Sequence, residues 1–203
     1  LPNPYSGTEE CFPDWRPHGS ADLNKAISES VNPYFYKITG GYKEFKGMGI
    51  QKAVDYLSQF GLGKKTGIDI PGEVEGVLPD PEWKKNNLGE KWSLGDTYNF
   101  AIGHGFVQVT PLQIANGISA IANNGTLYKP QIVKKVIDQE GNTIKEFPPQ
   151  KIKENFIKSE ALKSVQSAMR QTAASPNATA HMLNSLPVMV AAKTGTAQAA
   201  KEG

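Results

Sequence analysis

The segment Val188-Met-Val-Ala-Ala-Lys-Thr-Gly-Thr196, near the end of the sequence, says more about the fold than any other stretch. A short apolar run that opens into Lys-Thr-Gly-Thr is typical of a β-strand whose last residues leave the hydrophobic layer. These last residues carry a cation, two hydroxyls and a bare glycine backbone, which together can bind a carboxylate or an oxyanion. The pattern predicts a strand over 188–196 that presents Lys193 to an anionic ligand.

The same tripeptide occurs a second time, as Lys65-Thr66-Gly67 in a glycine-rich stretch. A three-residue match is weak by itself, so the rest of the sequence has to decide which copy is functional. We expect Lys65-Thr66-Gly67 to lie in a connecting turn.

Composition narrows the class of protein. The 203 residues suffice for one large domain or two small ones. Lys and Arg number 22 against 20 Asp and Glu, a formal net charge of +2, so we expect no nucleic-acid partner. No apolar run approaches the roughly 20 residues that a bilayer requires, so we predict no membrane span in this chain. The single cysteine, Cys11, excludes an internal disulfide.

Periodicity predicts a mainly helical chain with one β-hairpin. Residues 1–20, rich in Pro and Gly, indicate an irregular arm. Thr110-Pro-Leu-Gln113 predicts a capping box that opens a helix, and 127–147 predicts a hairpin that turns at Gly141-Asn142. The other predicted helices cover 21–29, 33–39, 48–60 and 159–172, with a short surface helix between Trp83 and Trp92.

Ser30-Val31-Asn32 lies on the corner between the first two predicted helices. Pro33 disfavours the helical region for Asn32 and fits the first position of the next helix, so we expect Asn32 to cap that helix. Taken alone, Ser30 and Asn32 could be no more than capping residues.

Together, Ser30-Val31-Asn32 and Lys193-Thr194-Gly195-Thr196 resemble two of the three signatures of penicillin-recognising acyl transferases. The third is a Ser-x-x-Lys motif that carries the nucleophile. Longer stretches resemble class B penicillin-binding proteins of the penicillin-binding protein 2 type, from about Trp15 onward. These stretches are KAISESVNPYFY (25–36), FGLGKKTGID (60–69), QVTPLQ (108–113), NATAH (177–181) and AAKTGTAQ (191–198).

The resemblance implies the α+β fold of β-lactamases and transpeptidases, with 21–203 as part of that domain. It also implies a serine D,D-transpeptidase that cross-links peptidoglycan stem peptides ending in D-Ala-D-Ala and is acylated by β-lactams. Its parent would be anchored in the bacterial inner membrane, face the periplasm and work with cell-elongation proteins. No cofactor is expected.

Carried over by this resemblance, each motif residue has an expected role. Ser30 would relay a proton to the leaving group, and Asn32 would hold the substrate amide. Lys193 would keep the field positive around Ser30 and the substrate carboxylate. Thr194 and Thr196, on either side of Gly195, would donate hydroxyls to that carboxylate, and the Thr196 N–H would form half of the oxyanion hole.

One departure from the family pattern is large: no serine in the sequence has a lysine three positions later. Ser20 is followed by Ala-Asp-Leu, Ser93 by Leu-Gly-Asp and Ser164 by Val-Gln-Ser. We therefore expect an internal fragment of the catalytic domain that lacks the nucleophile and the last sheet strands, and that is inactive alone.

Alternatives stay open at this point. A non-catalytic module could use the same groove only to bind β-lactams or peptidoglycan, or act as a cell-wall scaffold. A serine β-lactamase would need a deacylating base, and no Glu here lies in a recognisable context for one. His104 is expected to be structural or solvent-facing. Cys11, Asp14 and His18 are a weaker zinc candidate, since some relatives of the family are thought to bind zinc in this region.

Overall fold

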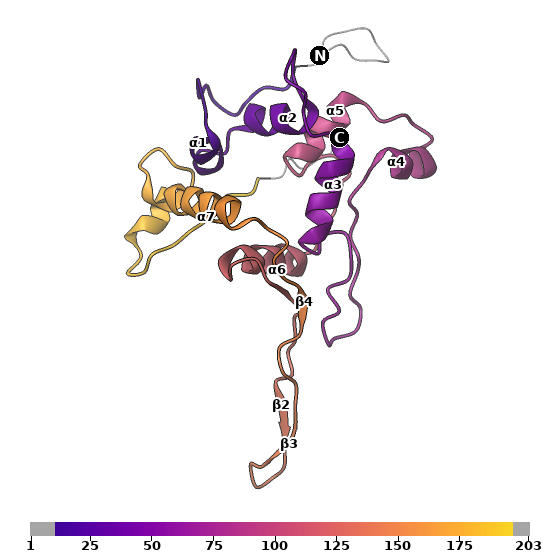
Figure 1. Ribbon diagram of the computed structural model, residues 1–203, viewed down its shortest axis with the longest axis vertical. Helices are drawn as coiled ribbons and strands as arrows, with labels where there is room; N and C mark the ends of the chain where they lie inside the picture. Colours follow the sequence, from indigo (N-terminus) through magenta and orange to yellow (C-terminus); the bar gives the residue numbers. More distant parts are fainter. Residues whose placement is uncertain (1–10, 197–203) are drawn as a thin grey trace, which may run out of the picture. The chain divides into compact units, whose positions relative to one another are not determined.

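The computed structural model of the chain describes residues 11–196, which form two compact units (Figure 1). The first unit contains residues 11–54, 79–107 and 163–196, and the second contains 55–78 and 108–162. The first unit is built from helices and the second combines helices with small antiparallel sheets, which confirms the predicted α+β class. Residues 11–20 are irregular, as predicted for the arm, and its first ten residues lie outside the described part.

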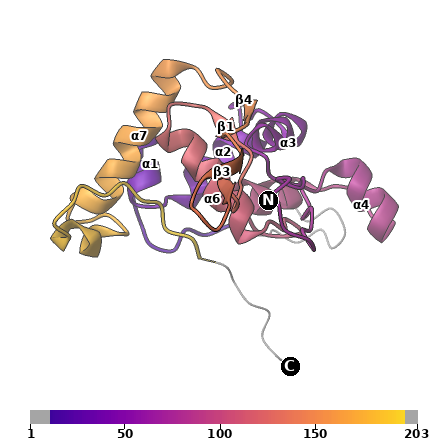
Figure 2. The same cartoon turned by 90° about the horizontal axis from the view of Figure 1, so that it is seen from below.

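The first unit is helical. Its elements are α1 (Leu23–Ser28), α2 (Asn32–Gly40), α4 (Pro81–Leu88), α5 (Leu94–Ala101), the 3-10 helix η1 (His181–Ser185) and parts of α3 (Ile50–Gln59) and α7 (Ser159–Ala174). In both Figure 1 and Figure 2, α1 lies beside α7. After α7 the chain passes through η1 into 188–196, drawn in yellow in Figure 2.

Helices α2 and α5 pack closely because of one glycine and two tyrosines. The rings of Tyr36 and Tyr98 stack with centroids 5.3 Å apart. A Cβ on Gly40 would lie 2.5 Å from Tyr98 Cε1, so only glycine fits there. The Tyr98 hydroxyl donates to the Gly41 carbonyl and satisfies its buried oxygen. This packing holds the C-terminal half of α2 against α5.

The predicted cap of α2 is wrong by one residue. Val31 is the N-cap and Asn32 is the first helical residue, with Pro33 in the first turn and no side-chain cap hydrogen bond. The Asn32 N–H is instead satisfied by Asp14 Oδ1 at 3.3 Å. A carboxylate from the arm therefore accepts a hydrogen bond from a backbone N–H at the start of α2, where the Asn32 side chain was expected to form the cap.

The second unit contains α6 (Pro111–Ala122), β1 (Leu127–Tyr128), β2 (Lys135–Ile137), β3 (Thr143–Glu146) and β4 (Lys151–Lys153). The predicted capping box is present, with Thr110 and Gln113 exchanging side-chain and backbone hydrogen bonds. Strands β2 and β3 form the predicted antiparallel hairpin, and β1 pairs with β4. The first strand of the predicted hairpin, residues 127–137, is too long. Only β2 pairs with β3, whereas β1 pairs with β4.

The predicted strand over 188–196 is wrong. Residues 189–196 have no regular secondary structure, because a strand needs a ladder partner and none lies within 11–196. Two residues of α7 form hydrogen bonds with the backbone of this segment instead. Ala192 N donates to Met169 O at 2.9 Å, and Arg170 Nη1 donates to Val190 O at 3.1 Å. The segment is thus held from one side by a helix.

The longest helix, α7, has 16 residues. No helix within residues 11–196 has the length and apolar character needed to cross a membrane.

Candidate functional site

A hollow of about 990 Å³ in the first unit brings the two sequence motifs together. All six residues predicted for the site line it: Ser30, Asn32, Lys193, Thr194, Gly195 and Thr196. The remaining lining residues are Trp15, Phe35, Ala101, Ile102, His104 and Thr179. One part of the lining is therefore polar and cationic, and another part is apolar and aromatic.

Ser30 has a left-handed backbone conformation, with φ at +58°. It follows the C-cap of α1, and the N–H of Val31 donates to Ala26 O at 3.0 Å, which is the hydrogen bond of a Schellman-type helix end. Glycine is the usual residue at this position, because a Cβ makes the left-handed region costly. Ser30 therefore occupies a backbone conformation that favours glycine.

Lys193 reaches that hydroxyl. Its Nζ donates to Ser30 Oγ at 2.9 Å and to the Thr194 carbonyl at 2.9 Å. Although much of the side chain is exposed, partial burial of the ammonium group lowers the pKa of Lys193 from its ordinary value. A partly desolvated cation bonded to a serine hydroxyl can stabilise negative charge and assist proton transfer through that hydroxyl.

Thr179 forms hydrogen bonds near both motifs. Its N–H donates to Ser28 O at 3.0 Å, just before the Ser30 turn. Its hydroxyl oxygen accepts a hydrogen bond from Thr194 Oγ1 at 3.0 Å. The Thr194 hydroxyl is thus already oriented in the hollow, although an incoming carboxylate would compete with Thr179 for it.

His104 comes from the glycine corner after α5 and also lines the hollow. Its Nε2 lies 3.0 Å from the Thr196 carbonyl oxygen, so the tautomer protonated at Nε2 donates to it. The structure therefore places His104 at the site and not only on the surface. The opposite side of Gly195 is open, because a Cβ there would have no atom within 4 Å.

The chain has relatives among known proteins. The family model for the penicillin-binding protein transpeptidase domain matches residues 2–203. The chain belongs to this family.

Relatives of known activity agree with the family model. The chain is 34% identical over 194 residues to the peptidoglycan D,D-transpeptidase MrdA of Acinetobacter baumannii, covering 95% of this chain and 28% of that protein. It is 33% identical over 204 residues to penicillin-binding protein 2A of Bacillus subtilis, covering 93% and 27%. The chain thus spans less than a third of the length of these relatives.

Solved structures of the transpeptidase family show the same fold. The penicillin-binding protein 2 of Helicobacter pylori, solved in complex with MreC, matches with a TM-score of 0.76 and 34% identity, over 93% of this chain and 33% of that one. Penicillin-binding protein 2 of Pseudomonas aeruginosa, in complex with WCK 5153, matches with 0.77 and 27%, over 95% and 42%. The predicted resemblance to the penicillin-binding protein 2 type is confirmed.

Sequence reasoning did not place Trp15, Thr179 and His104 in the site of this transpeptidase-family chain. Trp15 belongs to a proline-rich arm, and nothing in its pattern predicts which turn it will reach. Thr179 lies within a stretch that carries the family resemblance, so a signal existed for it. His104 lies between two glycines, and its reach to Thr196 depends on the path of a distant segment.

The zinc candidate does not fit the contacts of the arm. His18 Nδ1 lies 2.6 Å from Asp14 Oδ2, and His18 Nε2 accepts a hydrogen bond from Arg16 Nε at 3.1 Å, so both ring nitrogens are occupied. Cys11 is exposed. Within residues 11–196, no group of three or more His, Cys, Asp or Glu side chains could hold a metal ion.

Proposed function

We propose that this chain forms the substrate-binding part of a serine D,D-transpeptidase that cross-links peptidoglycan stem peptides and is acylated by β-lactams. The hydrogen bond of 2.9 Å between Lys193 Nζ and Ser30 Oγ is the single observation that carries this proposal. It joins residues 163 positions apart inside a hollow whose other polar groups suit a peptide with a free carboxylate.

The reaction needs a proton relay at Ser30. In the full-length protein, the serine of a Ser-x-x-Lys motif would attack the carbonyl of the penultimate D-alanine. The serine oxygen forms an ester with this carbonyl carbon as the peptide C–N bond breaks, and the proton that the serine gives up would reach the departing D-alanine amine through Ser30 Oγ. The amine of a second stem peptide attacks the ester, forms the new amide and releases the serine. A positioned acid or base of this kind contributes about 10²–10⁴ in rate.

The Lys193 segment would bind the end of the substrate. The carboxylate of D-Ala-D-Ala would lie against Lys193 and accept hydrogen bonds from the hydroxyls of Thr194 and Thr196. The Thr196 N–H would supply one donor of the oxyanion hole, a contribution of about 10²–10³ in rate. Asn32 lines the same hollow and would hold the substrate amide. Gly195 leaves room for the substrate backbone to approach.

The 203 residues alone are expected to bind without reacting, because no serine in them is followed by lysine at the third position. This favours, as a second function, a module that only binds stem peptides or β-lactams. The parent would act at the periplasmic face of the inner membrane, where peptidoglycan is cross-linked. The H. pylori structure in complex with MreC supports a cell-elongation protein as a partner.

A fluorescent penicillin tests the proposal. The full-length protein should become covalently labelled, and the Lys193→Ala variant should be labelled far more slowly. The 203-residue chain, shown to be folded by a cooperative thermal transition, should carry no label. It should still bind a D-Ala-D-Ala peptide in a titration, and Lys193→Ala should remove that binding. An unlabelled full-length protein, or a labelled serine within these 203 residues, would contradict the proposal.

A further inference from the structure

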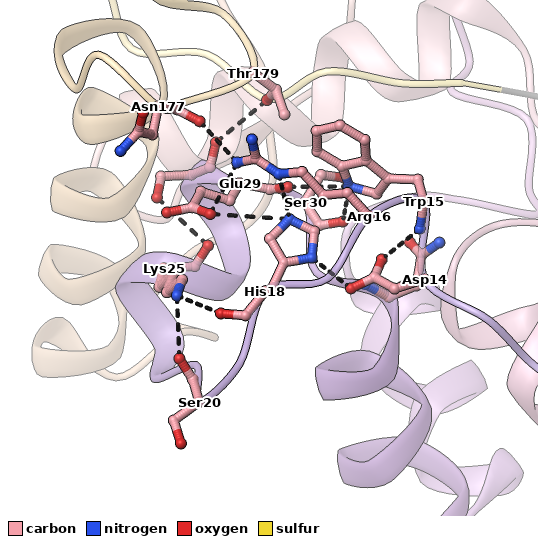
Figure 3. Close-up of polar contacts among 12 residues, drawn as sticks. Asp14, Trp15, Arg16, His18, Ser20, Lys25, Glu29, Ser30, Asn177 and Thr179 are labelled. Atoms are coloured by element: carbon pink, nitrogen blue, oxygen red, sulfur yellow. Dashed lines mark hydrogen bonds and ion pairs between the residues drawn. The ribbon is translucent and has the colours of Figure 1, made fainter.

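The arm residues Asp14, Trp15, Arg16 and His18 converge on the Ser30 turn (Figure 3). Trp15 Nε1 donates to the carbonyl oxygens of Glu29 and Ser30, each at 3.2 Å. Asp14 Oδ1 accepts from the N–H of Asn32 at 3.3 Å and from the N–H of Trp15 at 2.9 Å. The backbone on both sides of the strained Ser30 is thereby held by two consecutive arm residues.

Arg16 connects this turn to the loop that carries Thr179. Its Nη2 donates to Glu29 Oε2 at 3.0 Å and to the Asn177 carbonyl at 3.1 Å (Figure 3). Asn177 lies two residues before Thr179, whose hydroxyl bonds Thr194. The Arg16 guanidinium group thus connects the Ser30 turn with the loop whose Thr179 contacts the Lys193 segment.

His18 and Lys25 fix the arm itself. The His18 side chain is 1% exposed and lies between Asp14 and Arg16. Because Arg16 Nε donates to His18 Nε2, the ring proton lies on Nδ1 and is donated to Asp14. Lys25 Nζ donates to the His18 carbonyl at 2.6 Å and ties the arm to α1. The guanidinium plane of Arg16 is therefore set by a buried ring.

We propose that Trp15 and Arg16 are positioning residues for the Ser30–Lys193 pair. Trp15 keeps Ser30 in its left-handed conformation, and Arg16 sets the distance between the Ser30 turn and the Thr179 loop. A reacting pair has to be held within about 0.5 Å of its productive geometry, and a shift of 1 Å can cost about 10² in rate. The effect on reaction rate rests on the proposed transpeptidase function, whereas the effect on the geometry of the turn does not.

Two variants of the full-length protein separate the two residues. Trp15→Phe keeps a smaller aromatic ring in the hollow and removes the indole N–H, and we expect labelling by a fluorescent penicillin to slow about tenfold. Arg16→Ala removes both bonds of Nη2, and we expect a loss of about 10². Arg16→Lys keeps the charge but not the fork geometry, and it should fall between the native protein and Arg16→Ala. The loss should appear in the acylation rate constant more than in the affinity for penicillin.

Asp80→Ala is the control for general loss of stability. Asp80 caps α4 through Trp83 N and does not line the hollow. Asp80→Ala should lower the melting temperature without changing the labelling rate per folded molecule. If it slows labelling as much as Arg16→Ala, or if the arm variants label at the native rate, the positioning role is refuted.

Amide hydrogen exchange gives a readout that does not depend on acylation. We expect the amides of Val31, Asn32 and Thr179 to exchange faster in Trp15→Phe and Arg16→Ala, and at the native rate in Asp80→Ala. If the full-length protein takes no label but these amides respond as expected, the proposed function fails and the positioning role stands. Unchanged exchange at all three amides in both arm variants would overturn the positioning role, whatever the labelling shows.

Discussion

The two copies of Lys-Thr-Gly in this chain have the same side chains and opposite surroundings. Around Lys65-Thr66-Gly67, the carboxylate of Glu73 accepts from the N–H and hydroxyl of Thr66 and from Gly67 N. Around Lys193-Thr194-Gly195, the cation bonds Ser30 and the threonine hydroxyl bonds Thr179. The partner of the first copy, Glu73, lies six or seven positions away in the sequence. The second copy forms hydrogen bonds with residues that are 163 and 15 positions away.

The backbone separates the two copies as clearly as the partners do. Gly67 has a φ of +77°, which a side chain disfavours, and Thr66 is buried. Gly195 has no positive φ and open space where a Cβ would point. The same glycine therefore makes a turn possible in one copy and leaves room for a ligand in the other. A tripeptide motif acquires a function only through the groups that reach it.

The largest expected effect comes from replacing the lysine of each copy by alanine. Lys193→Ala removes the cation from the hollow, and we expect acylation of the full-length protein to fall about 10³-fold. Lys65→Ala changes an exposed side chain in the turn and should stay within about twofold of the native rate. Second-order rate constants for labelling by a fluorescent penicillin measure both. Equal losses in the two variants would remove the functional distinction between the copies.

Ser30→Gly separates the hydroxyl from the turn that carries it. Glycine fits the left-handed position, so the free energy of unfolding should be unchanged or higher by up to about 1 kcal/mol. Acylation should nevertheless fall about 10²-fold, at the lower end of the range for a proton relay, because water can partly replace the hydroxyl. Urea unfolding and labelling rates measure the two effects. A clear loss of stability would show that the serine is structural, which is the capping interpretation.

Sequence reasoning went furthest where structure is local. The capping box at Thr110 and Gln113 and the helical periodicity of 48–60 depend on neighbours within one or two turns, and the structure contains both. Ser93-Leu-Gly-Asp96 shows the opposite outcome. From the sequence, this stretch was used only to show that Ser93 is not followed by a lysine. In the structure, Ser93 and Asp96 form a capping box that opens α5. The signal for that helix was present in the sequence and was not used.

All six residues predicted for the site line one hollow, but the shape of that hollow was not predicted. The resemblance assigned Ser30 and Lys193 to one site, and the structure brings them together. The strand expected around Lys193 failed, because apolar periodicity gives a preference for extended backbone but no ladder partner. The arm contacts of Trp15 and Arg16 could not be predicted, because they join segments separated by up to 161 positions. The left-handed Ser30 belongs to the local end of α1, but a serine at a position that favours glycine gives no sequence signal for it.

Alanine at the two glycines should give crossed results. Gly195→Ala places a methyl group where the substrate backbone is expected, so acylation should fall about tenfold while the melting temperature stays the same. Gly67→Ala forces an alanine to a φ of +77° and should cost about 1–2 kcal/mol of unfolding free energy, with acylation per folded molecule unchanged. If Gly195→Ala loses stability and keeps its rate, the open side of Gly195 is not the substrate edge.

The smallest expected effect concerns pH and the charge of Lys193. Burial lowers the pKa of Lys193 below 10.5, so the ammonium loses its proton at a lower pH than an ordinary lysine does. Acylation that needs the charged form should therefore decline as pH rises through this lowered pKa. Lys193→Arg stays protonated throughout, and although its rate is expected to be lower, its profile should lack that decline. Labelling rates between neutral and alkaline pH measure both profiles, and a decline at the same pH in Lys193→Arg would assign the titration to another group.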